Sequence, residues 1–84
     1  MSYGPTAQDA IGAYMTAAEW LYDGQPMQPS VSGVEETKQG VFSIPDARAV
    51  CTYNEDAQEW VVKFPDDQIV KLRDADGELA VVTE

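Results

Sequence analysis

The sequence predicts an α+β fold in which one N-terminal helix packs on an antiparallel β-meander of four to five strands. Three observations support this fold: helical spacing of apolar residues over about 6–23, period-two alternation in four later segments, and turn-forming residues between those segments. A chain of 84 residues is expected to form one domain, residues 1–84, with a single core. A long connection over residues 24–40 then joins the helix to a meander over about 41–83.

The helix has recognisable start and stop signals. Thr6 and Asp9 have the three-residue spacing of a capping box, and Gly24 is expected to end the helix. Gly12 costs about 1 kcal/mol relative to alanine inside a helix; among several alanines it indicates a close approach of the helix to the sheet. The predicted apolar face comprises Ala7, Ala10, Ile11, Tyr14, Met15, Ala18, Leu21 and Tyr22.

The connection over residues 24–40 contains two prolines and three glycines and is longer than most connections in compact domains. A short edge strand over Val31–Val34 and a helical turn over 34–39 are two local alternatives. As a whole, the segment is either a mobile loop or a loop that contacts a partner. Residues 41–44 are expected to form a short strand that ends at a turn beginning with Pro45.

The main strands are expected over residues 47–53, 58–64, 68–73 and 78–83. Turns at 54–57, 65–67 and 74–77 would pair Cys51 with Trp60, Trp60 with Leu72, and Leu72 with Leu79. All three turns place one apolar set on the same face: Ala49, Cys51, Tyr53, Trp60, Val62, Phe64, Val70, Leu72, Leu79 and Val81. Because a slip of one residue would turn a strand over, this agreement favours the meander.

The outer face of the predicted sheet combines charged and apolar side chains. The predicted registers place Glu59 beside Arg73 and Arg73 beside Glu78, as cross-strand charge pairs. The same face carries Val50, Val61, Ile69 and Val82. These residues are either ordinary β-branched filling of a half-exposed sheet or an apolar contact surface for a partner or a second copy.

The composition restricts the partners and the compartment. Fifteen acidic and five basic residues give a net charge of −10 and a pI near 4.1, which disfavours direct contact with nucleic acid or an anionic membrane and favours a basic partner. No segment has the roughly 20 apolar residues of a membrane span, and the first residues lack the features of a secretory signal. The single cysteine, Cys51, is expected to be a small buried residue. These features predict a cytoplasmic protein.

The residue types that most catalytic and metal sites require are scarce. The chain has no histidine, one cysteine and no glycine-rich phosphate loop, so a non-enzymatic protein without cofactor, metal or catalytic residues is expected. Residues 74–78 resemble part of a calcium loop, but that alignment would place Leu72 and Thr83 at ligand positions. The Asp-Gly pair is better explained as a hairpin turn.

Acidic residues gather in the predicted turns. Alternate turns of a meander emerge at the same end, so the turns at 54–57 and 74–77 bring six carboxylates together, with Asp66 and Asp67 at the opposite end. We call these six the acidic end: Glu55, Asp56, Glu59, Asp74, Asp76 and Glu78. A solvated rim and an electrostatic docking surface for lysine and arginine are the two explanations of this cluster.

The functional hypothesis is a protein-binding module that inhibits a basic, nucleic-acid-handling protein by presenting carboxylates where phosphates would lie. In mode it resembles the small acidic phage-encoded inhibitors of restriction and CRISPR effectors, in size and charge alone. The alternative is a homo-oligomeric assembly accessory of a phage or mobile element, joined as a homodimer through the outer apolar residues. A small-ligand carrier with a pocket around Trp20 and Trp60 ranks third.

Overall fold

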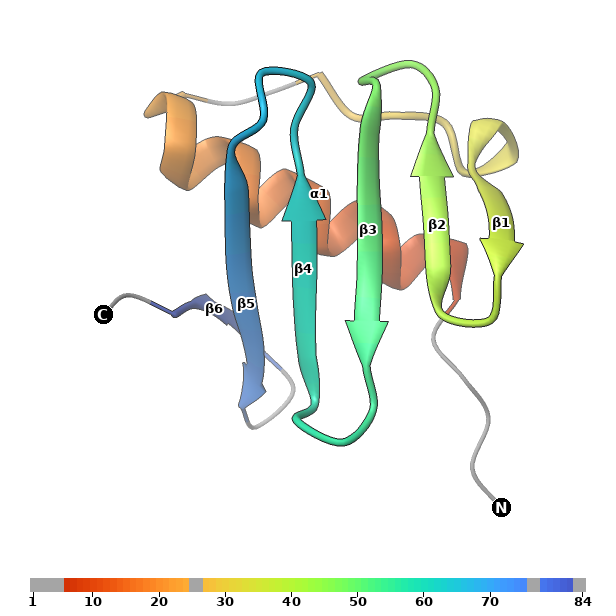
Figure 1. Ribbon diagram of the computed structural model, residues 1–84. Coiled ribbons are helices and arrows are strands. Elements are labelled where there is room, and N and C mark those ends of the chain that lie inside the picture. The colour runs from red at the N-terminus through yellow and green to blue at the C-terminus, as the bar shows by residue number, and fades with distance from the viewer. Residues whose placement is uncertain (1–5, 25–26, 76–77, 83–84) are drawn as a thin grey trace.

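The computed structural model describes residues 6–24, 27–75 and 78–82, with the backbone alone at 74 and 75. One helix, α1 (Ala7–Tyr22), covers one face of a six-stranded antiparallel sheet whose strands follow one another in chain order (Figure 1). The α+β class is therefore confirmed, with six strands instead of four to five. The remaining elements are η1 (Val31–Gly33), β1 (Glu35–Lys38), β2 (Val41–Ile44), β3 (Ala49–Asn54), β4 (Glu59–Lys63), β5 (Ile69–Ala75) and β6 (Glu78–Val81).

The extra strand, β1, lies inside the segment that the sequence predicted as a long connection. Both local alternatives for that segment are wrong, because residues 31–33 form a 3₁₀ turn and residues 35–38 form a strand. All four side chains of β1 are exposed, so the sequence has no apolar alternation that would predict the strand. Its pairing with the backbone of β2 holds it in place, although the register shifts between Glu36 and Lys38.

Helix α1 begins at the predicted capping box. The Asp9 N–H donates to the Thr6 hydroxyl at 3.2 Å, and the Thr6 N–H donates to the Asp9 carboxylate at 3.0 Å. The helix ends one residue earlier than predicted, since Asp23 adopts the left-handed conformation expected of Gly24. A Cβ at Gly12 would have no neighbour within 4 Å, so the close approach to the sheet depends on the alanines. The five residues buried in α1 are Ala10, Ile11, Ala13, Ala17 and Ala18.

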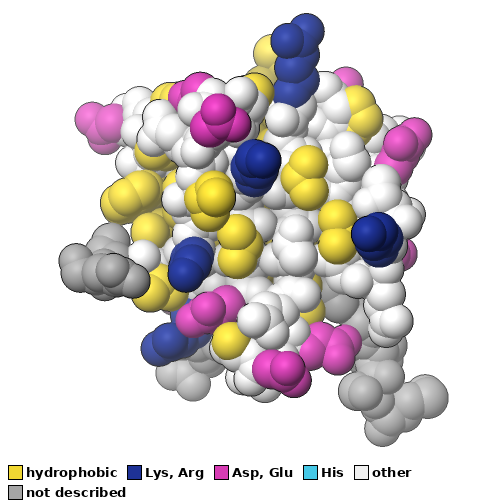
Figure 2. Space-filling view, in the orientation of Figure 1, with side chains coloured by type: hydrophobic (Ala, Val, Ile, Leu, Met, Phe, Trp, Pro, Cys, Tyr) yellow, Lys and Arg dark blue, Asp and Glu magenta, His cyan; other side chains and the backbone are white. Residues whose placement is uncertain are grey.

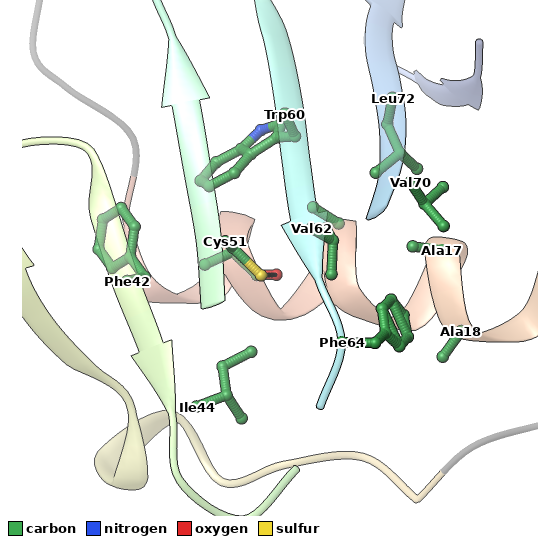
Figure 3. Close-up of a cluster of buried hydrophobic side chains, with 12 residues drawn as sticks. Ala17, Ala18, Phe42, Ile44, Cys51, Trp60, Val62, Phe64, Val70 and Leu72 are labelled. Atoms are coloured by element: carbon green, nitrogen blue, oxygen red, sulfur yellow. Dashed lines mark hydrogen bonds between the residues drawn. The ribbon is translucent and has the colours of Figure 1, made fainter. Parts of the chain in front are cut away.

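The core lies between α1 and the sheet (Figure 3). The set of residues predicted to face inward does so: seven are buried, and Tyr53, Leu79 and Val81 pack against them. Trp60 is 3% exposed, with ring centroids 5.1 Å from Tyr53 and 5.9 Å from Phe42. Small alanines on the helix leave room for these large side chains on the sheet, which explains why a chain this short forms a continuous core.

Two of the three predicted registers are wrong by two residues. Strand β3 pairs Tyr53 with Trp60 instead of Cys51 with Trp60, and β5 pairs Leu72 with Val81 instead of with Leu79. The β4–β5 register, with Trp60 opposite Leu72, is confirmed. A shift of two residues leaves every side chain on its predicted face, so alternation does not detect the error.

Candidate functional site

The β3–β4 turn and the β5–β6 hairpin emerge at the same end of the sheet (Figure 1). This follows from the meander, because each antiparallel strand reverses the chain direction and alternate connections return to one end. The β4–β5 turn, which carries Asp66 and Asp67, lies at the other end. The topology therefore brings together the two segments that carry the acidic end.

The β3–β4 turn presents two carboxylates on a well-defined backbone. Residues 55–58 connect the paired residues Asn54 and Glu59, and Glu55 and Asp56 are exposed. The Asn54 side-chain oxygen accepts from the N–H of Asp56 at 3.1 Å and from that of Ala57 at 3.4 Å. This arrangement is an Asx-type turn, which explains why the loop begins after Asn54 and not at it. The same turn moves the β3–β4 register by two residues.

Glu59 differs from Glu55, Asp56 and Glu78 because its carboxylate forms an ion pair within the described part of the chain. The Arg73 guanidinium donates to the Glu59 carboxylate at 3.0 Å across the β4–β5 ladder. The second predicted neighbour of Arg73, Glu78, is paired with Ala75 instead, because β5 continues past Arg73 to Ala75. Glu78 is exposed, and no ion pair is formed by it within residues 6–24, 27–75 and 78–82.

The other two predicted members of the acidic end are only partly described. The Asp74 backbone pairs with Leu79, and Asp76 lies outside the described residues. Over the described side chains, the acidic end thus consists of exposed Glu55, Asp56 and Glu78, with Glu59 held by Arg73. Exposed carboxylates attract a cationic surface through charge and do not require a cleft to do so.

The face of the sheet opposite α1 has a charge pattern that the sequence-based reasoning missed. Lys63 lies between Val50 and Ile69 in the ladder, and Lys71 pairs with Val61. Figure 2 shows apolar side chains near the centre of this open face, lysine and arginine among them, and acidic side chains toward its two ends. The pairings of three strands are needed to find this pattern, although each cation is visible in the sequence.

The predicted apolar contact surface on the open face is therefore interrupted by cations. Ile69 is 57% exposed, whereas Val50, Val61 and Val82 are half-buried. A second copy docked on these residues would have to desolvate the ammonium groups of Lys63 and Lys71. This arrangement makes the open face less apolar than the list of its valines and isoleucine suggests.

An open groove of about 780 Å³ lies between the C-terminal half of α1 and β6. Trp20 lines it and is 53% exposed, while the second tryptophan, Trp60, belongs to the core and does not line it. The two tryptophans therefore do not line one pocket here, as the ligand-carrier hypothesis expected them to. Its lining residues are Thr16, Glu19, Trp20, Asp23, Gly24 and Val81.

Three weakly acidic side chains have a raised pKa. Burial raises the pKa of the Cys51 thiol to about 12, and burial followed by the neighbouring Tyr22 and Cys51 raises the pKa of Tyr14. Desolvation and then the Asp66 carboxylate raise the pKa of Tyr22. All three shifts move the pKa further from neutral pH, the opposite of the lowered pKa that activates a nucleophile.

The described part of the chain lacks two features, a group of side chains that could hold a metal ion and a membrane-spanning helix. There, no three histidine, cysteine, aspartate or glutamate side chains are grouped so that they could hold a metal ion. Within the same residues, no helix has the length and apolar character needed to cross a membrane.

No family model, no curated protein and no solved structure matches this chain.

Proposed function

We propose that this protein is a non-enzymatic binding module whose acidic end docks on a basic, nucleic-acid-handling protein and inhibits it by occupying the place of phosphates. The single observation that carries the proposal is the meeting of the β3–β4 turn and the β5–β6 hairpin at one end of the sheet. Glu55, Asp56 and Glu78 are exposed there, and the nearby cation, Arg73, is already bound by Glu59.

The spacing of the two turns makes their charges act together. Measured across the strands, the residue pairs that flank these turns, Asn54–Glu59 and Ala75–Glu78, are two strand intervals apart, about 9–10 Å before sheet twist is included. This separation is close to the Debye length of about 8 Å at physiological ionic strength, so neighbouring carboxylates still repel one another. A cationic surface placed opposite them relieves that repulsion and accelerates association.

The charge balance supports a protein partner over nucleic acid or an anionic membrane. With a net charge of −10, the chain as a whole repels phosphates. A protein that binds DNA or RNA presents lysine and arginine in a groove that fits regularly spaced anions. Such a groove would accept carboxylates on a rigid turn, and nucleic acid and this protein would then exclude each other.

The test begins with capture of the partner from the native host by the immobilised chain, followed by elution in a salt gradient. The captured protein is then purified, and its affinity is measured by calorimetry with three chains. These are the wild type, the triple variant Glu55→Gln/Asp56→Asn/Glu78→Gln, and a control variant Glu35→Gln/Glu36→Gln/Asp46→Asn. The control removes the same number of charges from β1 and the β2–β3 turn.

We expect the partner to be a basic protein that loses its nucleic acid when this chain binds. If each carboxylate contributes about 0.2–1 kcal/mol, the triple variant should bind about 3- to 150-fold more weakly. The control variant should retain most of the affinity. Three results would each overturn the proposal: a triple variant that binds as tightly as the wild type, an affinity that does not change with salt concentration, or a ternary complex with nucleic acid.

The second candidate is a homo-oligomeric assembly protein joined through the open face. The exposure of Ile69, on the same open face as the half-buried Val50 and Val61, favours it. Sedimentation of the wild type and of Val61→Lys distinguishes the two candidates: a dimer that is lost in the variant and unaffected by salt supports assembly, whereas a wild-type monomer excludes it.

A further inference from the structure

The two edge strands of the sheet differ in how well they are protected against further pairing. Edge strand β1 is short, carries exposed Glu35, Glu36 and Lys38, and has an irregular register. These are features by which sheets block the addition of another strand. The opposite edge, β6, pairs regularly with β5 and carries the apolar sequence Leu79-Ala80-Val81.

The direction of the free hydrogen-bonding groups on β6 follows from one hydrogen bond. The Val82 N–H donates to the Lys71 carbonyl at 2.8 Å, so Val82 points its backbone groups toward β5. Hydrogen-bonded and non-hydrogen-bonded pairs alternate in an antiparallel ladder. The backbone N–H and C=O groups of Leu79 and Val81 therefore point to the outer edge, where no strand of the described chain pairs with β6.

The groove beside α1 lies next to this edge. Val81 belongs both to β6 and to the groove lining, and it packs against the core from the helix side of the sheet. A strand added to β6 would place the residue opposite Val81 on the same side. That residue would meet the exposed Trp20 ring and the carboxylates of Glu19 and Asp23.

We propose that β6 and the groove form a binding site for an extended segment of a partner protein in which arginine or lysine alternates with small apolar residues. The guanidinium or ammonium groups pair with Glu19 and Asp23, and their aliphatic stems and charges lie against Trp20. Residues 16–22 of α1 span about 9 Å, which matches about three extended residues. The backbone of that segment adds a seventh strand to the sheet.

Charge decides between this occupant and a second copy of the chain. Antiparallel pairing of β6 with itself would bring together two molecules of net charge −10, with Glu78 on each paired strand. Helix α1 carries no lysine or arginine that would offset Glu19 and Asp23. A cationic segment is attracted where a second copy is repelled. This site shares strand β6 with the acidic end, which includes Glu78, but it does not rest on the function proposed for the acidic end.

The probe is a capped hexapeptide of alternating valine and arginine, titrated into the ¹⁵N-labelled full chain. Two peptides serve as controls: one with glutamate in place of arginine, and one with methylated backbone nitrogens at alternate residues. We expect the arginine peptide to shift the Trp20 indole signal and to protect the Leu79 and Val81 amides from hydrogen exchange. Neither control peptide should do so.

Two chain variants localise the charge contribution. Glu19→Gln/Asp23→Asn should weaken binding of the arginine peptide by about 2- to 30-fold, whereas Glu35→Gln/Glu36→Gln, on the opposite edge, should leave it unchanged. The asparagine suits position 23 because that residue is left-handed with φ 52°.

Several results would overturn the proposal. These are absence of binding at millimolar peptide, equal binding of the glutamate or methylated peptide, or shifts confined to β1 or the open face. Protection of the Leu79 and Val81 amides in the free chain, together with a dimer in sedimentation, would assign the edge to a second copy.

Discussion

The single thiol of this protein provides a sharp test of how α1 covers the sheet. Cys51 is fully buried in the core (Figure 3). Its Sγ lies 3.4 Å from the Ala10 carbonyl oxygen of α1. Burial raises the pKa of this thiol from 9.0 to about 12. We predict that a thiol-specific reagent such as DTNB modifies the native chain only when the helix and sheet separate.

The magnitude follows from the thiolate fraction, because the thiolate is the reactive form. At pH 8, about one thiol in ten is ionised when the pKa is 9, and about one in ten thousand when it is 12. The lower thiolate fraction alone therefore slows the reaction of Cys51 with DTNB by about a thousandfold relative to the unfolded chain. Burial adds steric exclusion, so the measured rate should be lower still.

The assay compares the rate at which Cys51 releases thionitrobenzoate from DTNB at pH 8 in native buffer with the rate in concentrated urea, where Cys51 is exposed. At intermediate urea concentrations the rate should rise in step with the unfolded fraction measured by circular dichroism. A native rate within about tenfold of the unfolded rate would refute the arrangement of α1 over β3.

The same shift predicts a loss of stability at alkaline pH. The folded pKa of Cys51 is raised, so its contribution to stability is complete below about pH 9 and is lost as pH rises toward 12. Three pH units correspond to about 4 kcal/mol at most. Urea midpoints of the wild type should therefore fall more steeply above pH 9 than those of Cys51→Ala; equal slopes would contradict the assigned cause.

Three further predictions concern the core, the helix start and a turn. Leu72→Ala should lower the free energy of unfolding by about 3–5 kcal/mol in urea denaturation, whereas Ile69→Ala, on the exposed side of the same strand, should change it by less than about 0.5; similar losses would contradict the assigned faces. Thr6→Ala should cost about 1 kcal/mol and reduce helicity by circular dichroism; an unchanged midpoint would contradict the cap. Gly40→Ala should lower the free energy of unfolding by about 1–2 kcal/mol, since φ is +82° and the added Cβ would lie 3.3 Å from the Tyr53 carbonyl oxygen. An unchanged melting temperature would contradict that conformation.

The sequence determined which side chains face the core, because the period of two is a local property of each strand. It placed Trp60, Val62 and Leu72 on one face, and Val61 and Ile69 on the other, as the structure has them. It also determined the helix start, because a capping box lies within four residues. Both signals involve neighbours in the chain and are independent of distant contacts.

Tertiary structure alone decided the features that depend on pairing. Strand β1 has no apolar period and exists because the backbone of β2 lies beside it. A turn stabilised by the Asn54 side chain fixes the register in which Tyr53 pairs with Trp60. Apolar alternation cannot predict this register, because a shift of two residues leaves each side chain on the same face of the sheet. The cations of the open face and the groove of Trp20 and Val81 likewise bring together residues distant in sequence. Charge composition is additive along a chain, whereas a binding surface depends on which segments meet.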